Sequence, residues 1–270
     1  MDTVSTVPNS RLKMRYGPWA VVTGASDGIG KAFADELARQ GFSLILIARR
    51  RDVLECLAEK YRANYGIMCE VLACDLARPE AMSQIEAATK GRDAGLLVAA
   101  AGFGSSGEFL SNSVDDELLM VDVNCRAVTA LAHTFGQRFT NRGQGGIVLL
   151  SSLLAFQGVP GAANYAATKA YIQSLGEGLG REMAPKGVDV LSVAPGPIDS
   201  GFARRANLTY NMSQGPMVVA QQALKALGKK GTIRPGYLAK VLEGSLSMLP
   251  RRGRVRMMQQ VMGGMANAKK

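Results

Sequence analysis

The sequence has few of the residues that build disulfide scaffolds and metal sites. Its 270 residues include four cysteines, with no C-x-x-C pair, and a single histidine, His133. A disulfide framework is therefore excluded, and no metal site is expected. No apolar run approaches the roughly 18–20 residues that span a bilayer, and residues 1–16 lack the apolar segment of a secretory signal. We expect a protein of a reducing, cytoplasmic compartment.

Acidic residues are almost absent from the last quarter of the chain. Residues 201–270 contain 13 Lys and Arg and one acid, Glu243, for a net charge of +12, whereas residues 1–200 sum to −2. Such a field attracts phosphate-bearing substrates, acidic lipid surfaces or acidic partners, and an inert solubilising surface is the alternative. Nucleic-acid binding is not expected, because aromatic residues make up only 6% and no stacking array accompanies the basic residues.

Short apolar runs alternate with amphipathic stretches from Trp19 onward. The runs are too short for helices and too continuous for strands with one wet face, so they are typical of a parallel sheet buried on both sides. They cover residues 20–22, 44–48, 68–73, 96–101, 147–150 and 188–193. Helical patterns lie between them, at 31–40, 51–65, 80–90, 114–142 and 165–183. This alternation predicts an α/β fold with a doubly wound parallel sheet, the Rossmann architecture, in a single domain.

The first apolar run leads into a glycine-rich loop, Thr23–Gly30, followed by a helical pattern. Gly24 permits a tight turn, Gly28 permits backbone to approach a pyrophosphate, and Gly30 permits close packing of helix on strand. The helix N-terminus would offer free N–H groups to the phosphates. The loop therefore predicts a dinucleotide site, and a tight turn without a ligand is the alternative.

Arginines follow the second predicted strand, where an NAD site would have an acid for the ribose hydroxyls. The strand ends at Ala48 and is followed by Arg49, Arg50 and Arg51. Planar guanidinium groups suit a 2′-phosphate, so the sequence predicts NADP(H), with Arg49 the strongest single candidate. The alternative interpretation is a solvated helix start.

Tyr165 and Lys169 are four residues apart in a helical pattern and therefore lie on one face. An ammonium beside a phenol favours phenolate, so the pair can exchange a proton with a carbonyl or alcohol oxygen. Ser152 follows the strand at 147–150, and its hydroxyl is suited to hold the substrate oxygen. Each residue alone has an ordinary structural explanation, and their combination is what indicates chemistry.

Taken together, these motifs resemble the classical short-chain dehydrogenase/reductase family, from about Trp19 to Phe202. The resemblance implies catalytic roles for Ser152, Tyr165 and Lys169, and for Asn124 as the residue that holds a relay water. It also implies cofactor contacts for further residues, with Ser200 where the family often has threonine: Gly24, Ser26, Asp27, Gly28, Ile29, Gly30, Asp75, Leu76, Ala101, Gly102, Asn124, Tyr165, Lys169, Pro195, Gly196, Ile198 and Ser200.

One departure from the family pattern is the run Ala99–Gly102, where the family usually has Asn-Asn-Ala-Gly. The missing asparagine normally braces the central strand, so local bracing is in question. The opening Gly17–Thr23 is similar to members that act on steroids and on long-chain 3-oxoacyl thioesters.

The resemblance implies hydride transfer from NADPH to a ketone, an aldehyde or a 3-oxoacyl substrate, with Tyr165 as general acid/base. The resemblance also implies a small carbonyl or alcohol compound as the substrate, and an anionic or acyl compound would suit the basic region. A homodimer or homotetramer is also implied. The alternatives are an NADP-binding regulatory or scaffold protein, and a lyase, epimerase or dehydratase on the same fold.

The predicted organisation has four parts. Residues 1–17 form a flexible arm, 18–200 the dinucleotide-binding and catalytic core, 201–249 a substrate lid with closing helices, and 250–270 a basic amphipathic tail. In the tail, apolar residues spaced three and four apart form a helical stripe: Val255, Met258, Met262 and Met265. The stripe can pack on the body or a partner subunit, lie peripherally on an acidic membrane surface, or remain disordered.

Overall fold

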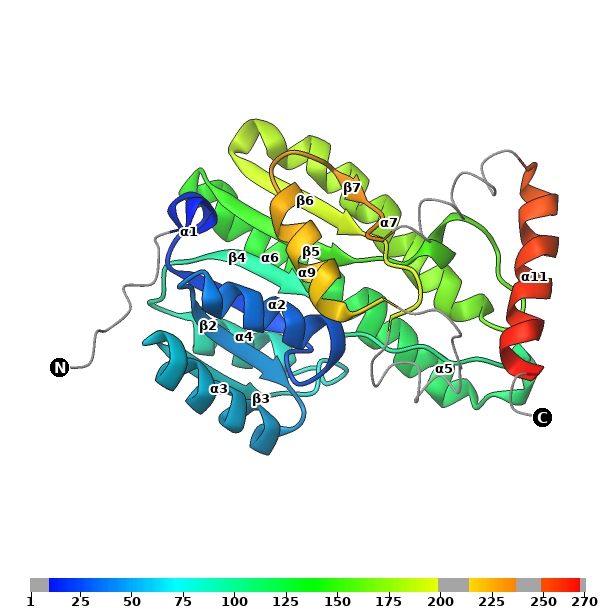
Figure 1. Ribbon diagram of the computed structural model, residues 1–270, viewed down its shortest axis with the longest axis horizontal. Helices are drawn as coiled ribbons and strands as arrows, with labels where there is room; N and C mark the ends of the chain where they lie inside the picture. Colours follow the sequence, from blue (N-terminus) through cyan, green and yellow to red (C-terminus); the bar gives the residue numbers. More distant parts are fainter. Residues whose placement is uncertain (1–9, 199–213, 237–248, 268–270) are drawn as a thin grey trace.

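A single parallel sheet organises the computed structural model, which describes residues 10–198, 214–236 and 249–267, with side chains to residue 262. Its seven described strands run in the order β3-β2-β1-β4-β5-β6-β7 (Figure 1). The order reverses direction between β1 and β4, so the predicted doubly wound architecture is confirmed. The strands are β1 (Trp19–Thr23), β2 (Ser43–Ala48), β3 (Cys69–Ala73), β4 (Ala94–Ala99), β5 (Gly145–Leu150), β6 (Val188–Val193) and β7 (Thr232–Ile233).

Helices cover both faces of the sheet. On one face lie α2 (Gly28–Arg39), α3 (Arg51–Tyr65) and α9 (Pro216–Ala226), and on the other α4 (Ala81–Thr89), α6 (Ala127–Arg142) and α7 (Ala163–Met183). Every residue of β1, β4 and β5 is buried, as their continuous apolar runs predict. No helix in the described ranges is long and apolar enough to cross a membrane.

The helical pattern predicted over residues 114–142 is not one regular helix. The structure has α5 (Val114–Val121), a π-helical turn at Asp122–Arg126, and then α6. Periodicity alone misses the π turn, because one extra residue in a turn leaves the apolar pattern on either side intact.

The predicted flexible arm is corrected in its second half, where residues 11–16 form the helix α1 (Arg11–Tyr16). Ser10 caps this helix by accepting a hydrogen bond from the Lys13 N–H at 3.1 Å. Tyr16 is fully buried, and its hydroxyl donates to Asp189 of β6 at 2.8 Å. One aromatic anchor thus holds a segment that its polar composition marked as loose.

The basic C-terminal segment forms α11 (Arg251–Asn267), which stands across the end of the sheet toward which the strands point (Figure 1). Met258 and Met262 are buried against Val159, Ala162 and Ala166. Of the three alternatives for this stripe, packing on the body is therefore the one observed, and the Met265 side chain lies outside the described residues.

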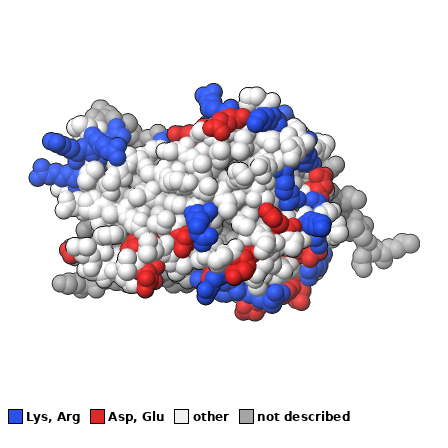
Figure 2. Space-filling view, turned by 180° about the vertical axis from the view of Figure 1, so that it is seen from behind, with Lys and Arg blue, Asp and Glu red and all other residues white. Residues whose placement is uncertain are grey.

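The arginines of α11 remain outside that packed contact. Arg251, Arg252 and Arg256 are exposed, and basic residues gather at the corresponding end of the molecule in Figure 2. About half of the predicted lid, at 201–213 and 237–248, lies outside the described residues. The described part of 201–249 includes α9, which belongs to the helical layer, and β7, which belongs to the sheet.

Candidate active site

The glycine loop joins the end of β1 to α2 and lies in backbone contact with the residues after β4. Gly24 has a φ of +67°, and a Cβ there would lie 2.8 Å from the Ala101 nitrogen. A Cβ on Gly30 would lie 2.3 Å from the Gly24 carbonyl oxygen. Neither position accepts a side chain without displacing backbone. The loop therefore packs closely against the start of α2 and the residues after β4, which is the packing role expected of glycines in such a loop.

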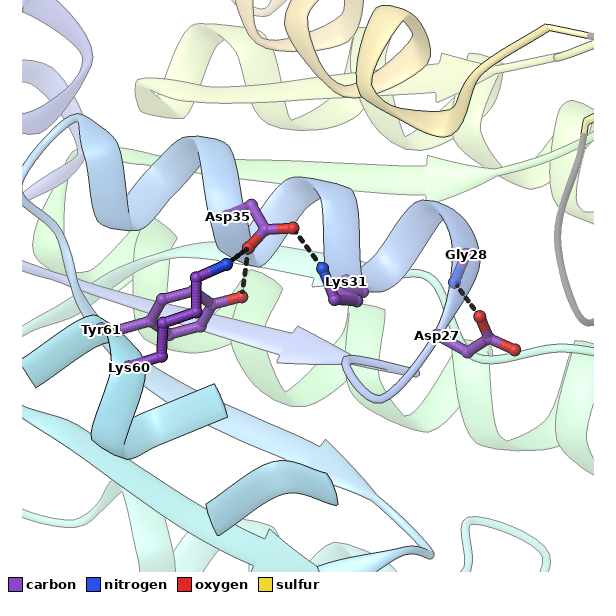
Figure 3. Close-up of polar contacts among 6 residues, drawn as sticks. All are labelled: Asp27, Gly28, Lys31, Asp35, Lys60 and Tyr61. Atoms are coloured by element: carbon purple, nitrogen blue, oxygen red, sulfur yellow. Dashed lines mark hydrogen bonds and ion pairs between the residues drawn. The ribbon is translucent and has the colours of Figure 1, made fainter. Parts of the chain in front are cut away.

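The first N–H of α2 is held by an acid of the loop. Asp27 precedes the helix, and its Oδ1 accepts a hydrogen bond from the Gly28 N–H at 2.7 Å (Figure 3). Asp27 is exposed, and Ile29 is half-buried beside it. A diphosphate bound at this helix end would compete with the Asp27 carboxylate for the Gly28 N–H.

The helix that carries the loop is fixed to its neighbour by a carboxylate. Asp35 of α2 accepts hydrogen bonds from Lys31 at 2.7 Å and from the Tyr61 hydroxyl at 3.0 Å, and it lies 3.7 Å from the Lys60 ammonium (Figure 3). Lys60 and Tyr61 belong to α3, so the two helices hold the glycine loop in place relative to β2.

The predicted adenosine end lies where β2 and β3 terminate side by side, with the Cys74 N–H donating to the Ala48 carbonyl at 2.9 Å. Arg50 donates to the Ser26 carbonyl at 3.0 Å and to its hydroxyl at 3.1 Å, which ties the strand end to the glycine loop. Arg49 is exposed and makes no ion pair or hydrogen bond with the described residues, unlike Arg50.

After β3, Asp75 folds its carboxylate onto the following turn, where Oδ1 accepts from the Ala77 N–H at 3.1 Å. Leu76 is buried in the core beside α4. The structure therefore places this predicted adenine-contacting pair at the same edge of the sheet as Arg49, one strand away.

Lys169 lies at the centre of the predicted catalytic group. Its side chain is only 6% exposed, its Nζ donates to the Leu150 carbonyl at 2.9 Å, and it lies 5.7 Å from the centroid of the Tyr165 ring. A Cβ on Gly102 would lie 3.4 Å from the same Nζ. Burial lowers the pKa of Lys169 to about 8, and the nearby Cys125 opposes this shift.

The two serines after β5 have different environments. Ser151 Oγ donates to the Lys169 carbonyl at 3.1 Å in the buried interior, so its proton is already used. Ser152 Oγ accepts from the Leu154 N–H at 3.2 Å, and among the described residues its own proton has no acceptor. This difference favours Ser152 as the substrate-binding hydroxyl, which is the choice that the spacing to Tyr165 indicates.

Asn124 occupies the π-helical turn and is fully buried. Its amide forms a two-way contact with the backbone of Phe103, donating to the carbonyl at 2.8 Å and accepting from the N–H at 3.1 Å. It also donates to Thr168 Oγ1 at 3.1 Å, next to Lys169. Single π turns occur frequently at functional sites, and this one brings Asn124 next to the segment that follows Gly102.

The predicted nicotinamide loop runs beside the residues after β5. The Leu153 N–H donates to the Pro195 carbonyl at 3.0 Å, and a Cβ on Gly196 would lie 3.3 Å from the Leu153 side chain. Ile198 is buried and pairs with Gln214. Ser200 lies outside the described residues.

The missing family asparagine at Ala99–Ala100 is compensated by Thr23. Its Oγ1 accepts from the Ala101 N–H at 3.1 Å and lies 3.5 Å from the Val98 carbonyl, so β1 and the end of β4 remain braced. Sequence reasoning missed this contact, and it also missed Thr168, Phe103, Glu117 and Asn164. Within the described residues, no group of three or more His, Cys, Asp or Glu side chains is placed to hold a metal ion.

The lowered Lys169 pKa gives a prediction for stability. Because the folded chain releases this proton near pH 8 and a free lysine does so near pH 10.5, the unfolded chain binds more protons between these values. The unliganded wild type should therefore become more stable to unfolding, relative to Lys169→Met, as the pH rises through this window. Urea denaturation at stepped pH measures it, and a flat difference would contradict the burial of the charge. The buried tyrosines contribute equally to both proteins and cancel.

The parallel sheet and its glycine-rich loop are typical of dinucleotide-binding α/β proteins, and comparison with known proteins identifies the family. The short chain dehydrogenase family model matches residues 18–211. This chain belongs to the short-chain dehydrogenase/reductase family, whose members use a nicotinamide cofactor.

Individual relatives include proteins named as dehydrogenases or reductases and one named as inactive. The chain is 36% identical to a 7beta-hydroxysteroid dehydrogenase of Clostridium sardiniense, covering 84% of this chain and 88% of that protein. It is 34% identical to the inactive hydroxysteroid dehydrogenase-like protein 1 of Mus musculus, covering 80% and 68%. It is 31% identical to the very-long-chain 3-oxoacyl-CoA reductase-B of Danio rerio, covering 87% and 76%.

Solved structures agree with the fold. A structure described in a study of 7beta-hydroxysteroid dehydrogenase stereoselectivity superimposes with a TM-score of 0.86 at 26% identity, covering 92% of this chain and 99% of that chain. A short-chain dehydrogenase from Sphingobium yanoikuyae in complex with NADPH has a TM-score of 0.76 at 28% identity, covering 87% and 97%.

Proposed function

We propose that the protein is an NADPH-dependent reductase of a ketone, an aldehyde or a 3-oxoacyl compound. The observation that carries this proposal is the buried Lys169, which the Leu150 carbonyl holds at the carboxyl end of β5, 5.7 Å from the centroid of the Tyr165 ring. Ser152 follows the same strand, and Asn124 donates to Thr168 on the helix that carries Tyr165. Such an edge, next to a glycine-rich cradle, is where doubly wound sheets bind ligands.

Each residue has a role that its position supports. Ser152 would hold the substrate oxygen through its available proton, and Tyr165 would donate a proton to that oxygen. Lys169, beside the phenol ring, would stabilise the phenolate and bind the ribose hydroxyls. Asn124 would hold a relay water from its π turn. The nicotinamide, when bound, supplies the hydride.

The rest of the cofactor would be held by residues from three loops. The glycine loop, with Gly24, Ser26, Asp27, Gly28, Ile29 and Gly30, would bind the diphosphate. Asp75 and Leu76 would contact the adenine, while Ala101, Gly102, Pro195, Gly196, Ile198 and Ser200 would line the nicotinamide half. Arg49 and Arg50 would bind the 2′-phosphate.

The exposed Arg49 gives the test of NADP preference. Arg49→Ala is expected to raise the KM for NADPH at least about tenfold and to leave the KM for NADH within a factor of two, because only NADPH carries the phosphate. Arg51→Ala is the matched control, since Arg51 lies 3.6 Å from Glu55 and makes an ordinary helix-surface pair. Equal effects of Arg49→Ala on both cofactors would contradict the assignment.

Two observations suggest substrate classes to test: the names of the relatives and the positive charge of α11. The named relatives include a hydroxysteroid dehydrogenase and a 3-oxoacyl-CoA reductase. The exposed arginines of α11 are suited to an anionic substrate group. NADPH absorbance should be followed against 7-oxo and 17-oxo steroids, 3-oxoacyl coenzyme A thioesters and simple aldehydes. Consumption with at least one class is expected, and none with any would refute reductase function.

A second candidate is an NADP-binding regulatory or scaffold protein without turnover. The observation in its favour is the 34% identity to a relative named as inactive. Here the serine, tyrosine and lysine are all present, and a binding protein has no need of all three. NADPH binding without turnover on the panel would support this second function. A lyase or epimerase would convert its substrate without net NADPH consumption.

Assembly and surface contacts are further parts of the proposal. A homodimer or homotetramer is supported by exposed apolar side chains on α5, including Val114 and Leu118, and by the broad uncharged area of the face shown in Figure 2. Peripheral contact with an acidic membrane would use the exposed arginines of α11, because its methionines are already packed.

A further inference from the structure

The carboxylate of Glu117, in the first turn of α5, is buried without a basic partner. It is 6% exposed, and among the described residues no lysine or arginine forms an ion pair with it. Three neutral side chains satisfy it instead. Oε1 accepts from Ser105 Oγ at 3.0 Å and from Asn112 Nδ2 at 2.7 Å, and Oε2 accepts from Asn164 Nδ2 at 2.6 Å. Burying an anion in this way is costly unless every acceptor is used.

The three donors come from segments that meet at the predicted substrate edge. Ser105 follows the Gly102–Phe103 segment after β4, and Asn112 follows the short helix η1 (Phe109–Ser111). Asn164 is in the first turn of α7, directly before Tyr165, and its amide also donates to the Glu117 carbonyl at 2.9 Å. A backbone bond also joins the loop after β4 to the residues before α7, since the Gly107 N–H donates to the Gly161 carbonyl at 2.9 Å.

Glu117 and Asn124 both contact the loop at 103–112, Glu117 from α5 and Asn124 from the π turn that continues α5. Asn124 holds the backbone of Phe103 at one end, and seven residues earlier Glu117 holds Ser105 two residues further along the loop. Seven residues are about two helical turns, so the two side chains leave the helix on the same side. The loop at 103–112 is therefore coupled to the N-terminal turn of α7.

We propose that Glu117 is a positioning residue for Tyr165, acting through Asn164 and setting the loop at 103–112 at a fixed distance from the phenol. This inference rests on the proposed reductase function. Hydrogen bonds to an ionised carboxylate are stronger than neutral ones, which suits a contact that must hold α7 at its first turn. Small misplacement of a reacting group, of about 1 Å, costs on the order of a hundredfold in rate.

The test exchanges the donor and the acceptor in the hydrogen bond between Asn164 and Glu117. In Glu117→Gln, either orientation of the new amide sets its nitrogen against the amide donor of Asn112 or Asn164. In Asn164→Asp, two carboxylates face each other. The double variant, Glu117→Gln with Asn164→Asp, restores the side-chain donor–acceptor pair between α5 and α7, but the Glu117 carbonyl still lacks its donor. Asp116→Asn is the matched control, because Asp116 is the exposed neighbour on the same helix and loses the same charge.

With the panel carbonyl compound that wild type reduces fastest, each single variant is expected to lose at least about tenfold in kcat, a fraction of the full misplacement cost. The double variant should regain part of the loss seen in Asn164→Asp, because the side-chain pair returns while the bond to the Glu117 carbonyl does not. Asp116→Asn should match wild type. The NADPH dissociation constant should stay within a factor of two throughout, because Glu117 is not part of the predicted cofactor site. Unchanged kcat in the single variants, or a double variant no better than Asn164→Asp, would overturn the proposal.

Hydrogen–deuterium exchange supplies a readout that does not depend on turnover. Exchange at 103–113 and at 161–166 should rise together in each single variant and be lower in the double variant than in Asn164→Asp, while α3 stays unchanged. If wild type reduces nothing on the panel, the reductase function fails and this coupling is still decided. Unchanged exchange in either segment would refute the positioning role.

Discussion

Tyr165→Phe is expected to reduce kcat by roughly 10²–10⁴-fold, the range that a positioned general acid contributes. Only the hydroxyl is removed, and Lys169 keeps its hydrogen bond to the Leu150 carbonyl. Folding and NADPH binding should therefore remain at wild-type levels. Single-turnover mixing of the NADPH complex with the carbonyl compound, followed by absorbance, measures the loss.

The matched control is Tyr171→Phe on the same helix. Tyr171 is 44% exposed, and its hydroxyl lies 2.8 Å from Thr129 Oγ1 of α6. This variant should reduce turnover by less than a factor of two, because it removes one ordinary exposed hydrogen bond. A Tyr165→Phe protein that keeps more than a tenth of wild-type turnover would contradict the acid–base role.

Gly30→Ala is expected to weaken NADPH binding at least about tenfold and to lower the free energy of unfolding by about 1–3 kcal/mol, the usual cost of overpacking. The added methyl would lie 2.3 Å from the Gly24 carbonyl oxygen and 3.0 Å from that of Thr23. Both contacts are with backbone, so relief requires α2 to move away from the loop. Cofactor fluorescence titration and urea denaturation measure the two effects.

Gly178→Ala in α7 is the control for this substitution. A Cβ there meets no atom within 4 Å, and the position is helical and exposed. It should stabilise the protein by about 0.5–1 kcal/mol, since alanine favours helix over glycine, and leave cofactor affinity unchanged. Wild-type affinity in Gly30→Ala would show that the loop is not the cofactor cradle.

The features that could be predicted from the sequence are those that depend on the pattern of neighbouring residues. Continuous apolar runs such as 44–48 and 188–193 appear as buried parallel strands. The four-residue spacing of Tyr165 and Lys169 places both on α7, with the ammonium beside the ring. These features depend on neighbours in sequence, and periodicity records them.

The features that could not be predicted depend on distant partners. Tyr16 is buried by its contact with Asp189, 173 residues away, so the polar arm gave no sign of a helix. In the sequence Glu117 is an ordinary first-turn acid, but its three side-chain partners lie 5, 12 and 47 residues away. The π turn at Asn124 leaves the flanking apolar pattern intact, so only coordinates reveal it.

The most direct test of the account is the fate of the hydride itself. Wild type should be mixed with NADPH deuterated at both C4 positions and the carbonyl panel, and the products analysed by mass spectrometry. We predict an alcohol product one mass unit heavier at the former carbonyl carbon, formed in step with NADPH loss and nearly absent with Tyr165→Phe. Tight NADPH binding without deuterium in any product would contradict the account and place the protein with its inactive relatives.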